Sequence, residues 1–395
     1  MTGPISYRGN VWKCYALQFF VFMHFISGVL VPFYTDWGGL NFTKIMLLQS
    51  WFSVAMFLFE VPTGVVADRW GRKVSCALGA LTTGIAALVY SSLPHFGLFF
   101  VAETLWALGA TLLSGADQAL LYDSLKADGR EGESKQVLAR KQSALLVALI
   151  VASPIGSAIA AVLGLRYAVM LMLVPQLVAV GIALSMREPP LVRQQESKRY
   201  FAIMREGLQL FATSRPLRRL TIDLVLGGFP AFMIIWTHQQ RMRELGVCIV
   251  WFGLVQTLLA VAQIAVLNLL KRFERLAGSS RRYLVLSALL PALCYLAAAL
   301  TDSLPLSLVL WTAVAGVGMT RATLIENYMH KHIDSAHRAT AMSTASMCNR
   351  VVMAAVMPLI GLLVDQRVAH AFVLLGGLLL AASVYSALAR HRLAD

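Results

Sequence analysis

The amino-acid sequence predicts an all-α integral membrane protein with twelve transmembrane helices. Three observations carry this prediction. Of the 395 residues, 58% are hydrophobic and 14% are charged, and the mean hydropathy is +0.68. The apolar residues form long runs, many of which reach the roughly 20 residues that a helix needs to cross a bilayer. These runs lack the period-two alternation of transmembrane β-strands, which argues against a β-barrel.

Hydropathy places six spans in each half of the chain. The first six are expected at residues 11–34, 42–66, 74–92, 96–122, 137–163 and 167–186. The second six are expected at residues 220–239, 247–270, 283–300, 304–328, 339–364 and 368–388. The first run is too long for the apolar core of a cleavable signal peptide, so we interpret it as a retained first span.

The net charge of +14 would suit a nucleic-acid-binding protein, but the basic residues are distributed differently. They gather in alternate loops between the apolar runs, which is the pattern of a multi-pass protein whose basic loops face the cytoplasm. We therefore expect a bacterial inner-membrane protein with both termini in the cytoplasm and no nucleic-acid partner. The five cysteines are scattered singly and predict no metal site.

The longest polar stretch, residues 187–219, separates two predicted six-helix halves, 1–186 and 220–395. It begins with Glu188-Pro189-Pro190, which ends a helix. Apolar and basic residues then alternate at helical spacing, which predicts an amphipathic helix on the cytoplasmic leaflet rather than a soluble linker helix. The residues that form this pattern are Phe201, Met204, Leu208 and Phe211, with Lys198, Arg199 and Arg205.

The two halves resemble each other weakly, as in transporters that are built from repeats. The ends of the fourth and tenth spans align without gaps, and this alignment places Asp117 opposite Arg321. Opposite charges within the membrane are less costly as a pair, so we expect these two side chains to attract each other. The alternative is that each pairs within its own half, with Glu326 as a second possible partner of Arg321.

A ten-residue motif follows the second span: Gly64-Val65-Val66-Ala67-Asp68-Arg69-Trp70-Gly71-Arg72-Lys73. It resembles the loop signature of the major facilitator superfamily, G-x-x-x-D-R-x-G-R-[RK], at its usual place between spans two and three. The glycines would permit close helix approach and a tight turn, and the remaining charged residues supply an acid and three cations. The alternative, basic residues placed only by membrane topology, does not account for Asp68 or the glycine spacing.

The resemblance implies alternating access around a central cavity lined mainly by spans one, four, seven and ten. It also implies a cytoplasmic latch between the halves when the cavity faces outward. The implied gating residues are Gly64, Asp68, Arg69, Gly71, Arg72 and Lys73, with Asp123 as a cation partner and Arg338 as the corresponding feature of the second half.

Two further segments bear on the direction of transport. The fifth span holds Ala152-Ser153-Pro154-Ile155-Gly156-Ser157-Ala158, which resembles a degenerate antiporter motif G-P-x-x-G-G and favours export; an ordinary proline kink explains it equally well. In the fourth span, Glu103 stands where related antiporters carry an arginine.

Ionisable residues at membrane depth are costly and usually line a cavity or form pairs. We interpret His24, Glu103, Asp117 and Arg321 as candidate substrate or proton sites, with Trp106 and Trp236 as candidate aromatic walls of the cavity. Structural pairing or snorkelling is the expected role of Glu60, Asp223 and Glu326, which lie near the cytoplasmic ends of their helices.

The leading hypothesis is a proton-coupled exporter of small amphipathic molecules, similar to the drug:proton antiporter group. The alternative is a dedicated carrier of a metabolite, siderophore or peptide in either direction. Neither requires a cofactor, and we expect a monomer in the lipid bilayer with a small-molecule substrate and a proton as coupling ion. No catalytic motif such as HExxH or GxSxG is present, so an enzyme is not expected.

Overall fold

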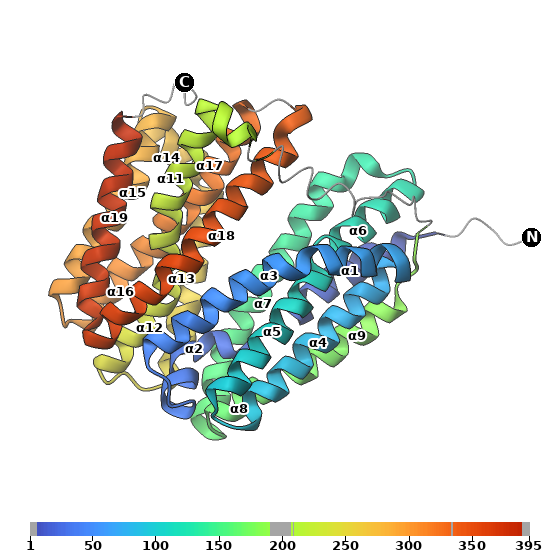
Figure 1. The fold of residues 1–395 in the computed structure, drawn as a ribbon, viewed down its shortest axis with the longest axis horizontal. Helices are drawn as coiled ribbons and strands as arrows, with labels where there is room; N and C mark the ends of the chain where they lie inside the picture. Colours follow the sequence, from blue (N-terminus) through green and yellow to red (C-terminus); the bar gives the residue numbers. More distant parts are fainter. Residues whose placement is uncertain (1–5, 190–206, 208, 333–334, 389–395) are drawn as a thin grey trace, which may run out of the picture. The chain divides into compact units, whose positions relative to one another are not determined.

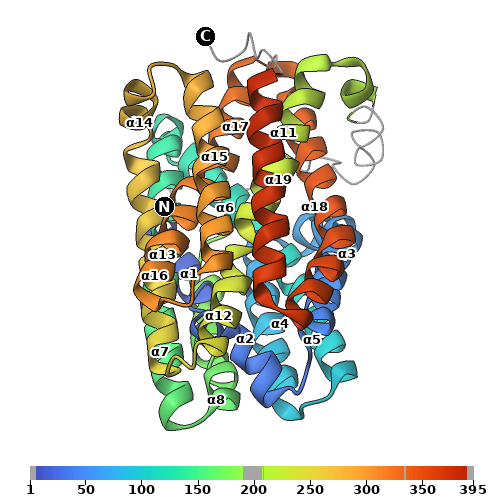
Figure 2. The ribbon, with the colours of Figure 1, turned by 90° about the vertical axis from the view of Figure 1, so that its left-hand side faces the viewer.

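Every element of the described structure is a helix (Figures 1 and 2). The computed structural model describes residues 6–189, 207, 209–332 and 335–388. Within these residues, eleven helices are long and apolar enough to cross a membrane. Lipid offers no hydrogen bonds to a backbone, so helices that satisfy their own N–H and C=O groups are the expected solution. The all-α membrane fold predicted from the sequence is confirmed.

The first expected span forms no helix long enough to cross a membrane. It divides into four short helical segments: α1 (Arg8–Val21), η1 (Phe25–Gly28), α2 (Leu30–Pro32) and η2 (Phe33–Trp37). Close packing requires Gly28 at the end of η1, because a Cβ there would lie 2.1 Å from the carbonyl oxygen of Ser153. Pro32 has no backbone N–H group, so it cannot donate the hydrogen bond that would continue a regular helix through this position.

The described Cα atoms divide into two compact units. Unit 1 comprises Met1–Leu40, Trp51–Tyr200 and Ile249–Gly253. Besides the segments of the first span, it contains most of α3 (Phe42–Trp70), α4 (Arg72–Ser92), α5 (Phe96–Leu113), α6 (Ala116–Ala127), η3 (Glu131–Glu133), α7 (Ser134–Val162), α8 (Leu165–Met170) and α9 (Leu173–Ser185).

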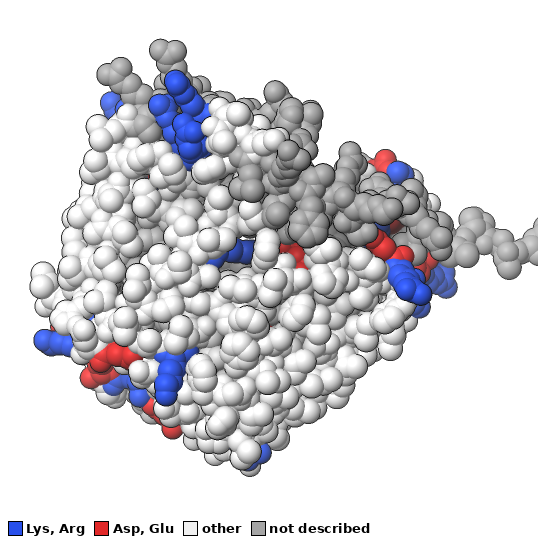
Figure 3. Space-filling model, viewed as in Figure 1, with Lys and Arg blue, Asp and Glu red and all other residues white. Residues whose placement is uncertain are grey.

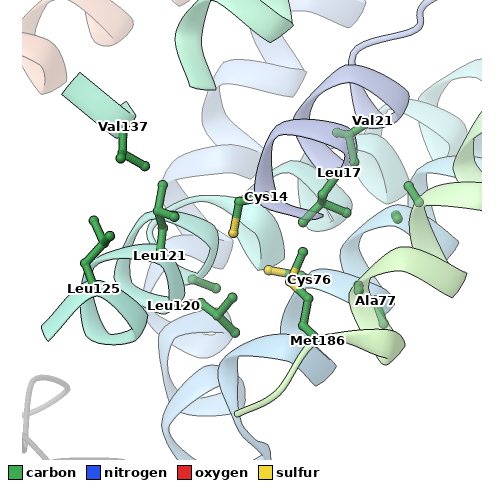
Figure 4. Close-up of a cluster of buried hydrophobic side chains, with 14 residues drawn as sticks. Cys14, Leu17, Val21, Cys76, Ala77, Leu120, Leu121, Leu125, Val137 and Met186 are labelled. Carbon is green, nitrogen blue, oxygen red and sulfur yellow. The ribbon is translucent and has the colours of Figure 1, made fainter. Parts of the chain in front are cut away.

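The core of unit 1 brings together α1, α4, α6, α7 and α9. Its buried side chains are mostly small or aliphatic, which lets the helices approach closely. Figure 4 shows the labelled members of this cluster: Cys14, Leu17, Val21, Cys76, Ala77, Leu120, Leu121, Leu125, Val137 and Met186. The cysteines are free thiols that pack here as small apolar groups.

Unit 2 comprises Asn41–Ser50, Phe201–Cys248 and Leu254–Asp395. Its helices are α11 (Arg215–Phe232), α12 (Ile234–Glu244), most of α13 (Val250–Asn268), α14 (Leu270–Leu276), α15 (Ser280–Leu300), α16 (Leu304–Ala313), η4 (Val314–Gly318), α17 (Met319–His332), α18 (Ser335–Gln366) and α19 (Val368–Leu388). The division at 186 and 220 expected from the sequence stays a prediction. The expected amphipathic helix falls largely outside the described residues: Lys198, Arg199, Phe201, Met204, Arg205 and Leu208.

The start of α3 is held inside unit 2 by a carboxylate. The side chain of Asp365, near the end of α18, accepts hydrogen bonds from the backbone N–H of Phe42 at 2.6 Å and of Thr43 at 3.0 Å. Gly361 lies one turn earlier in α18, and a Cβ there would come within 2.6 Å of Thr43 Cα. The carboxylate satisfies two N–H groups that every helix start leaves unpaired.

The four spans that the sequence assigns to the cavity are all interrupted. Span one divides as described above, and span four divides between α5 and α6 at Gly115, whose φ is +79°. Span seven divides at Met233, between α11 and α12. Span ten contains the π-helix η4 between α16 and α17. In a regular helix the backbone polar groups bond to one another, whereas an interruption leaves some of them available to other partners. Such interruptions are common at transport sites.

The surface is largely uncharged. Figure 3 shows one face, on which most atoms are white and the charged side chains are few. Large apolar side chains are exposed along several helices, for example Val309 at 67% and Leu359 at 57%. Such exposure would be costly in water over so large an area, and lipid removes that cost. The chain is therefore a multi-pass membrane protein.

Candidate functional site

The loop between α3 and α4 depends on Gly71. Its φ is +95°, a conformation that side chains with a Cβ rarely adopt. A Cβ on Gly71 would also lie 3.2 Å from Cδ of Glu188. That carboxylate accepts hydrogen bonds from the backbone N–H groups of Arg72 at 2.7 Å and Lys73 at 3.0 Å. Glu188 therefore stabilises the start of α4, where the helix dipole favours an anion.

Arg72 forms an ion pair with Asp123, the residue that the sequence predicts as a cation partner. This contact joins α4 to α6, and about a fifth of each side chain is exposed (20% and 23%). Partial exposure allows solvent to weaken the pair, so it can break at modest cost. The contact exists in the structure, and its role in gating stays a prediction.

Three further gating candidates, Gly64, Asp68 and Arg69, are exposed, whereas Lys73 is half-buried. Asp68 has no hydrogen bond or ion pair to another described residue. Gly64 makes no close approach here, since a Cβ on it would meet no described atom within 4 Å. Arg338 belongs to α18, but its side chain is outside the described part of the structure.

Glu103 on α5 is the centre of a buried polar cluster in unit 1. Its side chain is 4% exposed, and its Oε1 accepts a hydrogen bond from the Tyr34 hydroxyl at 3.0 Å. The hydroxyls of Tyr34 and Tyr90 are also 3.0 Å apart. Both tyrosines are buried, at 2% and 1%. The carboxyl group thus lies in a protein interior among neutral hydroxyl groups.

Aromatic rings surround this cluster and extend it toward His24. Tyr90 lies 6.0 Å from Trp106, and Trp106 lies 5.1 Å from the His24 imidazole, ring centre to ring centre. Phe33, Trp37 and Phe99 pack on the other side, with Phe33 and Trp37 stacked at 5.0 Å. Three of the expected site residues, His24, Glu103 and Trp106, therefore belong to one continuous arrangement of polar and aromatic groups.

A second candidate site follows the break in span four. Asp117 lies in the first turn of α6, two residues after Gly115, and forms an ion pair with Lys141 of α7. The side chains are 15% and 7% exposed, respectively. The start of α6 favours the aspartate, and Lys141 neutralises its charge. At these exposed fractions the pair is not completely enclosed by the protein.

Arg321 of α17 is held in a fully buried network in unit 2. Its guanidinium donates to Asp223 of α11 at 2.5 Å, to Ser386 at 2.6 Å and to Ser287 at 2.7 Å. Asp223 and Arg321 have side chains with 0% exposure. Gly227 makes room for this side chain, because a Cβ there would lie 2.5 Å from Arg321 Nε.

The expected attraction between Asp117 and Arg321 is therefore wrong for this structure. Each charge has a partner within its own unit, Lys141 and Asp223 respectively. The physical reason is desolvation: a buried charge binds the nearest counter-charge that can also complete its hydrogen bonds. The alternative that each pairs within its own half is the arrangement observed, although Asp223 rather than Glu326 is the recorded partner of Arg321.

Unit 2 also buries an aromatic and polar group on α12 and α16. Trp236 is 5% exposed, and its role as an aromatic wall of a cavity stays a prediction. His238 and Trp311 are both fully buried, and their ring centres lie 6.0 Å apart at an interplanar angle of 62°. His238 could have been noticed in the sequence as a titratable residue inside the expected seventh span. It lies one residue from the expected end of that span, where a polar residue is ordinary.

The structure adds three more residues that the sequence did not single out for a site. Lys141 could have been noticed as a cation inside the expected fifth span. Tyr34 and Tyr90 look like ordinary membrane tyrosines in the sequence, because only the fold brings their hydroxyls to Glu103.

Comparison with known proteins identifies the class. The sequence profile described as Major Facilitator Superfamily matches residues 14–325, so the chain belongs to the major facilitator superfamily. A relative from Bacillus subtilis (strain 168), the uncharacterized MFS-type transporter YxaM, is 23% identical over 243 residues. That alignment covers 60% of this chain and 59% of the relative, so the similarity spans about three fifths of the relative's length.

Solved structures share the fold over nearly the whole chain. The nucleoside transporter NupG has a TM-score of 0.79 at 14% identity, covering 97% of this chain and 100% of its own. A D-xylose-proton symporter has a TM-score of 0.74 at 12% identity, covering 96% of this chain and 97% of its own. At these identities the similarity establishes the fold alone.

Proposed function

We propose that this protein is a secondary active transporter that couples the movement of small molecules to protons by alternating access. Membership of the superfamily supports transport, and the names of the similar proteins all describe transporters. We place it in a bacterial inner membrane with both termini in the cytoplasm, because its basic loops alternate with uncharged ones. The proposed substrates are small amphipathic molecules, and the proposed direction is export.

The observation that carries proton coupling is the Glu103 cluster. Glu103 is a buried carboxyl group whose Oε1 accepts a hydrogen bond from the Tyr34 hydroxyl. The stability of each protonation state therefore depends on these close neighbours. A change in hydration or in the tyrosine contacts can then bind or release a proton, which is what a coupling site must do.

The cluster also has a route by which substrate could act on it. Trp106 contacts both Tyr90 and His24, so an apolar molecule that displaces Trp106 would disturb the hydroxyl next to Glu103. The energetic requirement is a differential one: substrate must interact more strongly with one protonation state than with the other. Aromatic walls with a few polar groups suit small amphipathic molecules.

A second candidate function is the transport of a polar metabolite. Similar folds include the nucleoside transporter NupG and the D-xylose-proton symporter. The buried polar groups of His238 and Trp311 favour this alternative, because a drug that is mostly apolar would leave them without hydrogen bonds.

Accumulation of the fluorescent cation ethidium in inside-out vesicles tests the leading proposal. We expect uptake that requires an acidic interior and that Glu103→Gln abolishes. Asp36→Asn is the matched control, since Asp36 is an exposed acid of the same unit and should behave as wild type. Uptake that ignores the pH gradient in the wild type contradicts proton coupling. If Glu103→Gln keeps the wild-type pH dependence, Glu103 is not the coupling residue, and His24 becomes the next candidate.

A further inference from the structure

Three uncharged side chains on α12 and α16 each have a buried polar atom without a hydrogen-bond partner. The atoms are Nε2 of His238, Nε1 of Trp311 and Oγ of Ser307. All three residues have 0% exposure. Buried polar atoms are nearly always hydrogen-bonded, so a group of orphaned atoms requires an explanation. Ligands commonly supply such missing partners.

The three side chains come from two helices of unit 2 that contact each other. Ser307 and Trp311 are four residues apart in α16, so their side chains share one face of that helix. His238, on α12, packs its ring against the indole of Trp311 with centres 6.0 Å apart. Arg321 Nε is also without a partner, but the terminal nitrogens of that guanidinium are hydrogen-bonded to Ser287 and Asp223.

The protonation state of His238 determines which ligand atoms can form a hydrogen bond with its Nε2. Its Nδ1 lies 2.7 Å from the carbonyl oxygen of Ile234, which can only accept a hydrogen bond. Nδ1 therefore carries the proton, and Nε2 of the neutral ring is an acceptor. Trp311 Nε1 is only a donor, and the Ser307 hydroxyl is both donor and acceptor. The group offers complementary atoms for a ligand with both donor and acceptor functions.

The nearest cation in the sequence of α12 is already neutralised. Arg241 binds Glu244 at 2.9 Å, pairs with Asp302 and donates to the carbonyl of Thr301 at 2.9 Å. Its two terminal nitrogens are therefore committed to partners at the end of the helix, whereas its Nε is buried without a partner. A ligand group at His238 and Trp311 meets dipoles and aromatic rings rather than a free charge, so an uncharged group fits best.

We propose that His238, Ser307 and Trp311 form a substrate subsite for a neutral group that both donates and accepts hydrogen bonds, such as a hydroxyl or an amide. This inference rests on the proposed transport function and narrows its substrate class. It requires that the substrate present at least one donor to Nε2 of His238 and one acceptor to Nε1–H of Trp311. Molecules without such groups would leave the atoms unsatisfied and bind weakly.

Equilibrium binding to purified protein in nanodiscs tests the subsite without any pH gradient. The neutral probes are radiolabelled uridine and D-xylose, and the charged probe without hydrogen-bonding groups is tetraphenylphosphonium. The variants are Ser307→Ala, Trp311→Phe and His238→Phe. The control is Trp251→Phe, because Trp251 is 57% exposed. Melting temperatures of the ligand-free variants are measured in parallel.

We expect the wild type to bind at least one neutral probe, and each subsite variant to weaken that binding about tenfold, the equivalent of one lost hydrogen bond. Tetraphenylphosphonium binding should not change. Ligand-free Ser307→Ala should melt at or above the wild-type temperature, because it removes an unsatisfied polar atom and little volume. Trp311→Phe leaves a cavity and His238→Phe loses the bond to the Ile234 carbonyl, so these two variants are compared by affinity. Ser307→Ala removes a single oxygen and remains informative if the aromatic variants fail to fold.

Three outcomes would overturn the inference. The wild type binds neither uridine nor D-xylose; the variants bind neutral probes as the wild type does, which is expected if water alone fills the site; or ligand-free Ser307→Ala melts at a lower temperature with unchanged affinity. Failure of proton coupling is separate, since it would abolish gradient-driven uptake and leave these equilibrium affinities as they are.

Discussion

Lys141 of α7 and Asp117 of α6 form an ion pair directly after the break in span four. In unit 2, Arg321 also follows an interruption, the π-helix η4, but its pair with Asp223 is more completely buried. Its side chains are 0% exposed, compared with 7% and 15% for Lys141 and Asp117. A charge that nothing from solution can reach is suited to holding helices together, whereas a partly accessible pair can respond to a proton or substrate.

The pair of Asp117 and Lys141 should therefore be needed for transport beyond its contribution to stability. Lys141→Met alone leaves a largely buried carboxylate without its counter-charge, and we expect a loss of about 3 kcal/mol or more. The double variant Asp117→Asn/Lys141→Met removes both charges and should regain most of that stability. Transport by the double variant should stay below a tenth of wild type. Thermal melting and vesicle uptake at equal protein amounts measure the two effects, and full uptake by the double variant would make the pair purely structural.

The opposite result is expected for Arg321 and Asp223. Arg321→Met should greatly reduce the yield of folded protein, because Asp223 would be left charged in a dry interior. The double variant Arg321→Met/Asp223→Leu should restore folding and retain at least half of the wild-type transport, since the pair only holds α17 against its neighbours. Detergent-solubilised yield by size-exclusion chromatography and vesicle uptake check this. Wild-type stability with no uptake in the double variant would instead place these charges in the transport cycle.

Asp68→Asn should separate gating from folding. The exposed Asp68 has no described partner, so its loss should change stability by no more than about 0.5 kcal/mol. We expect transport to fall about tenfold or more, the equivalent of one charge-assisted contact that forms elsewhere in the cycle. Glu131→Gln is the matched control, because Glu131 is an exposed acid of η3. Equal uptake rates in Asp68→Asn and the control would leave the motif without a gating role for its acid.

The two glycines of the motif should behave differently. Gly71→Ala forces a residue with a Cβ to a φ of +95° and toward Glu188, so we expect a loss of about 1–2 kcal/mol. Gly64→Ala replaces a glycine inside α3 where a Cβ meets no described atom, and should be neutral or stabilising by up to about 1 kcal/mol. Thermal melting of both variants decides this. If Gly64→Ala stays stable yet transport falls, close approach at Gly64 is required in another state.

Much of the fold followed from the sequence because a bilayer leaves few options. Long apolar runs must satisfy their backbone hydrogen bonds internally, so they become helices wherever they lie in the chain. The motif also predicted the tight turn at Gly71, because a turn of this kind depends on the backbone conformation of a single residue. The residues that break spans one and four, such as Pro32 and Gly115, are visible in the sequence, but their consequences depended on packing.

The partners of the buried charges were decided by tertiary structure. Sequence position alone paired Asp117 with Arg321, whereas helix packing brings Lys141 to one and Asp223 to the other. Desolvation makes that choice strict, because a charge removed from water is stabilised only by groups within a few ångströms. The sequence by itself thus determined that this is a helical membrane protein of a recognisable superfamily. Only the folded chain determined which buried polar groups are satisfied, as Glu103 is, and which, like Nε2 of His238, are left without a partner.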